Sequence, residues 1–149
     1  MISFSDDELY RRGTQTLLAC WAAYARGTIG ASVQYLPGVT AAIFPHEPER
    51  AYYNNALLGC DLTASARGIA LDAMEVEYSA AGITAFAAWV HEEDAAMRID
   101  LQRRGYRFSE ATRAMGMALD NVHLPSQEVD LGSLDWTGYL RLFGLPPEQ

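Results

Sequence analysis

The chain has 149 residues, of which 50% are hydrophobic and 20% are charged, and its formal net charge is −8. This length and composition suit one soluble domain with a sizeable core. The acidic balance excludes a protein that binds nucleic acid through a basic face. All 11 basic residues are arginine, so chemistry that needs a lysine, such as a Schiff base or a P-loop lysine, is excluded too.

The first element expected is a helix over residues 6–26. Ser5, with Glu8 three positions later, fits a capping box. One face of this helix should be apolar, and it is marked by Leu9, Leu17, Cys20, Trp21 and Tyr24. The segment "ASVQYLPGVTAAIFP" then predicts two strands joined by a tight turn at Pro37-Gly38, because proline sets the first turn position and glycine accepts a positive φ at the second.

Alternating strands and helices are expected next. A third strand is predicted over 51–58, and a helix over 62–81 that ends at Gly82. The segment 84–90 is so uniformly apolar that it should be a central strand buried on both faces.

A last helix is predicted over 91–104, with acidic residues in its first turn and arginines in its last, as a helix dipole favours. The segment "YRFSEATRAMGMALD" then predicts one or two closing strands.

This order predicts an α/β fold, with a mixed, mostly antiparallel twisted sheet and helices on both faces. The domain should span residues 1–120. Residues 121–149 read as a linker and a short apolar helix containing Trp136 and Phe143. That helix must cover its own domain, a second domain or a partner chain.

Cys20 and Cys60 lie far apart in apolar surroundings, so we expect two buried, reduced thiols in a cytoplasmic protein. The acidic start lacks the apolar stretch of a signal peptide, and no run of about 18 apolar residues predicts a membrane span. His46, His91 and His123 are too dispersed to predict a metal site by spacing.

The helix, buried strand, helix and Gly105-Tyr106 pair in "RGIALDAMEVEYSAAGITAFAAWVHEEDAAMRIDLQRRGYR" resemble the GNAT superfamily of acetyl-CoA-dependent N-acyltransferases. The resemblance covers about residues 6–120. The flanks "YYNNALL" and "EVDLGSLDWTGYLRLFGLPP" look like the N-terminal half of tandem GNAT proteins. In such proteins a first, degenerate domain precedes a second domain that keeps the cofactor motif.

The resemblance implies acetyl-CoA as cofactor and a Gln/Arg-x-x-Gly-x-Gly/Ala loop whose backbone N–H groups hold the pyrophosphate. The corresponding stretch is "LTASARGIAL", in which Arg67, Gly68 and Ala70 echo the motif. Arg67 and Gly68 are therefore the candidate cofactor-binding residues of a degenerate loop.

The family often uses a tyrosine as general acid four residues before the Gly-aromatic pair, and Leu101 stands there. The family also has an asparagine earlier in the same helix, and the corresponding position here is near Asp94. His91 with the carboxylates of Glu92 and Glu93 follows the buried strand, where α/β sheets place ligands, so His91 and Glu92 are candidate bases for deprotonating an amine. The carboxylates could equally cap the next helix.

Asn54 and Asn55 are unusual in a strand, and with Tyr53 they are candidates for binding the acceptor. The alternative is a bulge or a polar network that fixes the sheet, with Tyr52 and Tyr53 packed beside it.

Three functions remain open. In the first, the chain is the cofactor-poor half of a tandem enzyme that acts on a primary amine. Its C-terminal tail would then bind a second GNAT domain or another copy of the chain. Alternatively it is a non-catalytic module for small-molecule binding or self-association. Otherwise it is a complete acetyltransferase with a divergent loop, in which water or Tyr106 replaces the missing tyrosine.

Overall fold

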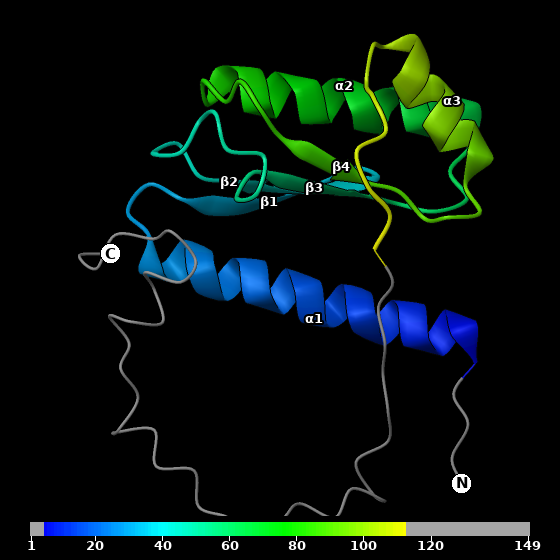
Figure 1. The fold of residues 1–149 in the computed structure, drawn as a ribbon, viewed down its shortest axis with the longest axis horizontal. Helices are drawn as coiled ribbons and strands as arrows, with labels where there is room; N and C mark the ends of the chain where they lie inside the picture. Colours follow the sequence, from blue (N-terminus) through cyan, green and yellow to red (C-terminus); the bar gives the residue numbers. More distant parts are fainter. Residues whose placement is uncertain (1–4, 113–149) are drawn as a thin grey trace, which may run out of the picture. The chain divides into compact units, whose positions relative to one another are not determined.

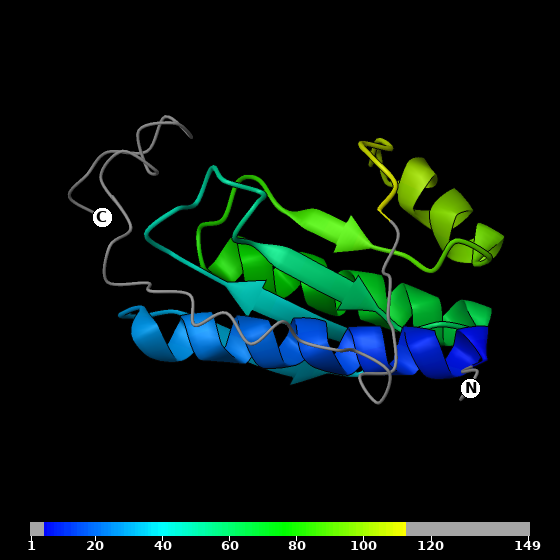
Figure 2. The same ribbon diagram turned by 60° about the horizontal axis from the view of Figure 1, so that its bottom comes forward.

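The structure is a computed structural model that describes residues 5–112. These residues form three helices and a four-stranded mixed sheet, so the chain is an α/β protein. Helix α1 lies on one face of the sheet and helix α2 on the other (Figures 1 and 2). The predicted linker and apolar helix over 121–149 lie outside the described residues.

Helix α1 spans Asp6–Gly27 and begins as predicted, because the Oγ of Ser5 accepts a hydrogen bond from the backbone N–H of Glu8. The Glu8 carboxylate accepts hydrogen bonds from Arg11 at 2.8 Å and from Arg12 at 2.6 Å. These bonds, that to Arg11 above all, lower the pKa of Glu8 to about 2.

The buried face of α1 differs from the predicted one. The side chains that pack on the sheet are Leu17, Leu18, Trp21 and Ala25. Cys20 is exposed and Tyr24 is 67% exposed, so placing both on the buried face was wrong. The prediction that both thiols are buried fails for Cys20, and Cys60 is half-buried.

Strands β1 (Ser32–Leu36) and β2 (Val39–Ile43) form the predicted hairpin, and Leu36 pairs with Val39 across the two-residue turn. Gly38 has a φ of +76°, which a side chain rarely adopts. The turn also packs tightly, because a Cβ on Gly38 would lie 2.9 Å from a methyl carbon of Leu62. The turn is therefore a contact point between the hairpin and the start of α2.

Strand β3 spans Asn55–Leu58 and pairs antiparallel with β2, while β4 (Ala87–Trp89) pairs parallel with β3. The strand predicted from residue 51 begins only at Asn55, because the backbone N–H groups of Tyr53 and Asn54 turn back to the carbonyl of Arg50. The sheet order is β1-β2-β3-β4.

Two strand predictions need correction. In the described sheet β4 lies at the edge and is only half-buried, so it is not a central strand buried on both faces. The described residues 106–112 contain no strand, and the rest of the predicted closing segment, to residue 120, lies outside the described range.

Helices α2 (Ala64–Ala80) and α3 (Ala95–Arg103) are shorter than predicted. Gly82, with a φ of +71°, follows α2 as predicted. Helix α3 begins after Asp94, whose carboxylate accepts from the N–H of Met97, so the predicted start at residue 91 was wrong. No helix in the described part of the chain is long and apolar enough to cross a membrane.

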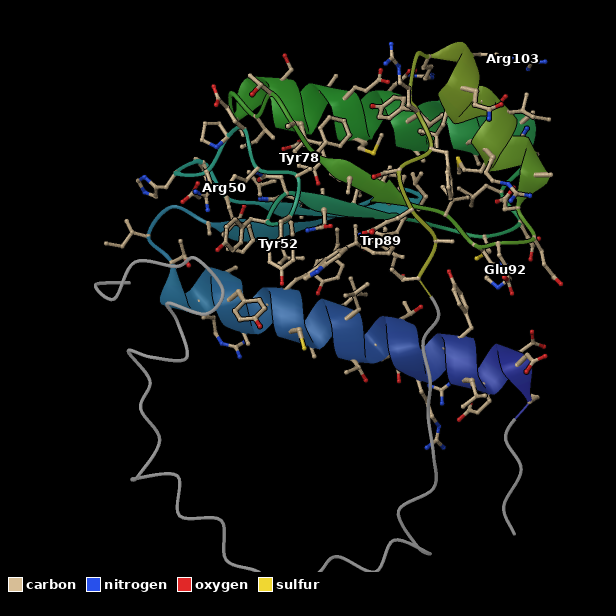
Figure 3. All side chains as sticks on the ribbon, viewed as in Figure 1. Arg50, Tyr52, Tyr78, Trp89, Glu92 and Arg103 are labelled. Carbon is tan, nitrogen blue, oxygen red and sulfur yellow. The ribbon has the colours of Figure 1, made fainter. Side chains whose placement is uncertain are left out.

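Each face of the sheet has its own apolar cluster. On the α2 side, twelve buried residues form the main cluster, among them Tyr78, whose ring stacks on Phe86 at 4.1 Å and whose hydroxyl donates to the Ala42 carbonyl at 3.3 Å. On the α1 side, the apolar cluster of the described residues has three buried members, Trp21, Ala42 and Phe44. Figure 3 shows Tyr78 and Trp89 on opposite sides of the sheet. Of the candidate site residues, Asn54, Asn55 and His91 lie at or near ends of strands, and Arg67 and Gly68 lie on α2.

Candidate functional site

Most of the stretch expected to hold a pyrophosphate, residues 64–71, lies inside helix α2. The helix begins at Ala64 behind the cap Thr63, whose Oγ1 accepts from the N–H of Ala66 at 3.2 Å. The N–H of Arg67 donates to the Thr63 carbonyl at 2.9 Å. From that point on, helical geometry gives each N–H a carbonyl partner one turn back. The backbone N–H groups of Arg67 and Gly68 are therefore used by the helix.

The loop before the helix is closed by packing. The N–H of Gly59 donates to the carbonyl of Gly38 at 2.9 Å, which joins the loop to the hairpin turn. Leu62 packs against the main cluster and fills the space next to Gly38 and Gly59. The segment between β3 and α2 thus packs around the apolar side chain of Leu62.

The side chain of Arg67 is held within the chain. Its Nε donates to Oδ2 of Asp100 on α3 at 2.7 Å, and its Nη1 donates to the Leu62 carbonyl at 2.9 Å. The Arg67 side chain is only 16% exposed. Hydrogen bonding to Arg67 is the main reason why the pKa of Asp100 is lowered.

A shallow hollow of about 360 Å³ lies beside this ion pair, and Arg67, Asp100, Arg103 and Arg104 line it. Arg103 also contacts Asp100, at 3.3 Å. Arg104 pairs with Asp72 at 2.7 Å and with Glu75 at 2.9 Å. Every arginine that lines this hollow is therefore balanced by a carboxylate from α2 or α3.

The candidate bases lie at the carboxyl end of β4. His91 is half-buried, and its Nδ1 accepts from the N–H of Glu93 at 3.2 Å. Glu92 is exposed in the turn before α3, and Figure 3 shows it pointing outward. The alternative in which Glu92 and Glu93 cap α3 is wrong, because Asp94 caps it.

A cluster of three side chains forms here that sequence reasoning missed. The Tyr10 ring meets the His91 ring edge-on at 4.5 Å, and the Cys60 thiol donates to the Tyr10 hydroxyl at 3.1 Å. Burial, followed by the bond to Cys60, raises the pKa of Tyr10 to about 12. Cys60 and His91 each lie two residues beyond a strand of the parallel pair, and that spacing was the available signal.

A second hollow, of about 420 Å³, adjoins this cluster between α1 and the ends of β1, β2 and β3. Tyr10, Thr14, Thr40 and Cys60 supply polar side-chain atoms, and leucines supply most of its apolar lining. The hollow can hold a small, mostly apolar molecule that carries one hydrogen-bonding group.

Asn54 and Asn55 form a polar network at the amino end of β3. Asn54 is fully buried; its Oδ1 accepts from the N–H of Phe44 at 2.8 Å, and its Nδ2 donates to the carbonyls of Glu47 and Arg50. The Nδ2 of Asn55 donates to the Tyr52 carbonyl, and its Oδ1 accepts from the indole N–H of Trp89. These contacts match the structural alternative, a network that fixes the sheet.

The two candidate tyrosines differ in setting. Tyr53 is 37% exposed and packs against Tyr52 and Phe44. The hydroxyl of Tyr106 donates to the Glu75 carboxylate at 3.2 Å, and burial together with Glu75 raises its pKa above the ordinary value.

The candidates thus fall into separate groups. Asn54 and Asn55 lie at the amino end of β3, whereas His91 follows the carboxyl end of β4, and Arg67 lies on α2 on the other face of the sheet. Among the residues that the structure describes, no group of three or more His, Cys, Asp or Glu side chains is placed to hold a metal ion.

Comparison with protein-family models, with curated proteins and with solved structures finds no match to this chain.

Proposed function

We propose that this chain is a GNAT-like domain of an N-acyltransferase that does not itself hold the pyrophosphate of acetyl-CoA. The observation that carries the proposal is the position of Arg67 and Gly68 inside α2. A working loop of this type presents free backbone N–H groups to the phosphates. Here those groups belong to the helix, and Leu62 closes the segment that precedes it.

The order of elements supports the acyltransferase part of the proposal. An antiparallel β1-β2-β3 start is followed by a helix, a strand parallel to β3, and a further helix that ends at Gly105-Tyr106. The helices lie on both faces of the sheet (Figure 2). This is the arrangement that the GNAT resemblance implies for the region from residue 6 onward.

The side chains at the familiar catalytic positions support the absence of independent activity. Leu101 stands where the family often places a general-acid tyrosine, and it is 6% exposed within the main cluster. Asp94, near the expected asparagine, is used as the cap of α3. The domain would therefore contribute its surface to an enzyme whose cofactor is held elsewhere, on a second GNAT domain or another copy.

A second candidate function is a non-catalytic module that binds a small molecule. The hollow beside Tyr10 and Cys60 favours it, because the hollow adjoins the carboxyl end of β3, one strand of the parallel pair, and open α/β sheets bind ligands at such ends. In that case the GNAT-like scaffold would bind a ligand on the α1 side without transferring an acyl group.

Calorimetric titration of the purified chain with acetyl-CoA and with CoA tests the main proposal. We expect no saturable heat at millimolar ligand, and no thiol release from acetyl-CoA in the presence of a polyamine. Micromolar binding that is lost in the Gly68→Ala variant would mean that Gly68 belongs to a working phosphate loop. That result would overturn the cofactor-poor assignment.

A further inference from the structure

Strand β1 forms one edge of the described sheet, and the proposed function does not use it. The direction of its hydrogen bonds follows from its neighbour β2. Just before β2, the carbonyl of Gly38 accepts from Gly59 on the β3 side, and just after it the N–H of Phe44 donates to Asn54 on the same side. Because the direction alternates along a strand, residues 39, 41 and 43 bond to β1.

The open edge of β1 presents main-chain groups of two residues. The partners of residues 39, 41 and 43 in β1 are Leu36, Gln34 and Ser32. The N–H and C=O groups of Val33 and Tyr35 therefore point away from β2, towards the open edge. In the described part of the chain these groups have no hydrogen-bond partner.

This edge lacks the features that usually keep sheet edges apart. Proteins protect an edge strand with charged side chains, a proline or a bulge. The sequence has no charged residue between Arg26 and Glu47, the pairing of β1 is regular, and Pro37 lies in the turn. Two copies with a net charge of −8 each repel one another over most of their surface, so this neutral edge is where they can approach.

Two copies of β1 fit each other in an antiparallel register centred on Gln34. Val33 of one copy then faces Tyr35 of the other, and all outward main-chain groups of both residues are bonded. Val33 and Tyr35 lie on the same face of the strand, where Val33 packs against the α1-side cluster. The Tyr35 side chain, 67% exposed in one copy, would pack beside Val33 of the other.

We infer that β1 is a self-association edge, through which two copies of this chain join their sheets antiparallel about a two-fold axis at Gln34. The partner is a second copy because the same strand supplies both halves of the hydrogen-bond pattern. The inference stands whether or not the chain is an acyltransferase domain.

The first test is Gln34→Glu, measured by sedimentation equilibrium of the full chain at increasing concentration. The native chain should show a reversible monomer–dimer equilibrium. In the variant two like charges face each other at the axis, so the dimer should weaken about tenfold or more. The matched control is Gln15→Glu, which adds the same charge at an exposed position of α1 and should dimerise like the native chain.

Two further variants test the strand pairing itself. Tyr35→Pro removes an outward N–H but no bond to β2, so it should weaken the dimer and leave the circular dichroism spectrum unchanged. Gln34→Cys, with the exposed Cys20 changed to serine, should form a disulfide-linked dimer on mild oxidation, because the two cysteines face each other. Ser32→Cys in the same background should not, since Ser32 would face Leu36 of the other copy.

A native chain that stays monomeric at every concentration overturns the inference, and so does a dimer that Gln34→Glu leaves unchanged. Dimerisation seen only after removal of residues 1–4 also overturns it, because the start of the chain would then occupy the edge. If Tyr35→Pro does not fold, Gln34→Glu and the cysteine variants decide. Titration with CoA is independent, so the two proposals can fail separately.

Discussion

At the scale of single residues, Asn54 organises more backbone than any other side chain in the described sheet region. Its amide bonds three main-chain groups between residues 44 and 50, and its own carbonyl accepts from the N–H of Ala87 at the start of β4. The side chain of Asn54 therefore connects the end of β2 with the loop after it, and its main-chain carbonyl adds a bond to β4. Such a network specifies a unique arrangement only when all of its groups are bonded.

Replacing Asn54 with alanine should therefore be costly. The variant leaves the buried N–H of Phe44 without its partner and removes one bond from each of the Glu47 and Arg50 carbonyls, and we expect a loss of about 3 kcal/mol in the free energy of unfolding. Urea denaturation measures it. Gln34→Ala, on exposed β1, serves as control and should change stability by less than about 0.5 kcal/mol. Equal losses in the two variants would contradict the network.

Residue patterns predicted some of these roles and missed others. The Ser5 cap was readable because capping depends on neighbouring residues only. The predicted face of α1 included Cys20 and Tyr24, whereas their neighbours Trp21 and Ala25 pack on the sheet. Helical spacing shows which residues share a face, but it does not fix how the helix is rotated about its axis relative to the sheet. The contact of Tyr10 with Cys60 and His91 joins residues far apart in sequence, which no local pattern reveals.

At the scale of elements, the start of α2 decides the function that we propose. Thr63 caps the helix four residues before Arg67, and so the motif-like stretch is wound into helical turns. A cap at residue 63 was readable in the sequence as a threonine before a helical segment. The sequence did not reveal that this cap removes the phosphate loop. The same residues can form either a loop or the first turn of a helix, and only the packing of Leu62 distinguishes the two.

The hairpin turn provides a prediction at this scale. Gly38→Ala should destabilise the protein by about 2 kcal/mol, because alanine disfavours a φ of +76° and its Cβ would lie 2.9 Å from Leu62 and 3.0 Å from Ala70. Thermal and urea unfolding measure the change. Gly68→Ala is the matched control inside α2, and it should stabilise the helix by about 0.5 to 1 kcal/mol. Two changes of the same sign would contradict this account of the turn.

The order and type of the first seven elements were predicted correctly, whereas strand lengths and the position of β4 were not. Apolar runs predict burial, and Thr84–Val90 was read as a strand covered on both sides. Hydrogen bonds to the carbonyl of Pro48 hold Thr84 and Ala85 against the loop, and only Ala87–Trp89 remains a strand. Such loop contacts depend on tertiary structure and leave no periodic signal.

At the scale of the whole described domain, shifted pKa values predict how stability varies with pH. On the acid side, Glu8 and Asp100 have lowered pKa values. The stabilising contribution of Glu8 is present above its unfolded pKa of 4.5 and is lost as the pH falls towards 2, and that of Asp100 is lost as the pH falls below its unfolded pKa of 3.8. On the alkaline side, Tyr10, Tyr78 and Tyr106 have raised pKa values. Their contribution is present below pH 10 and is lost as the pH rises through their folded pKa values.

We therefore expect the melting temperature to be highest between about pH 5 and 9 and to fall on both sides. Scans from pH 3 to pH 11 measure this. Tyr106→Phe should make the alkaline fall shallower, because phenylalanine cannot ionise in the unfolded chain. A variant with the same alkaline slope as the native chain would show that the Tyr106 hydroxyl does not contribute to this fall.

The unequal size of the two apolar clusters has a dynamic consequence. Among the described residues, the apolar cluster that joins the sheet to α2 and α3 has twelve buried members, and the cluster on the side of α1 has three. Regions with fewer buried contacts open at lower free energy than the whole molecule unfolds. Helix α1 can then separate as a cooperative unit while the rest stays folded. The two faces of the sheet would thus open on different time scales: the α2 side would stay folded, while α1, which carries Tyr10, would open reversibly from Cys60 and His91.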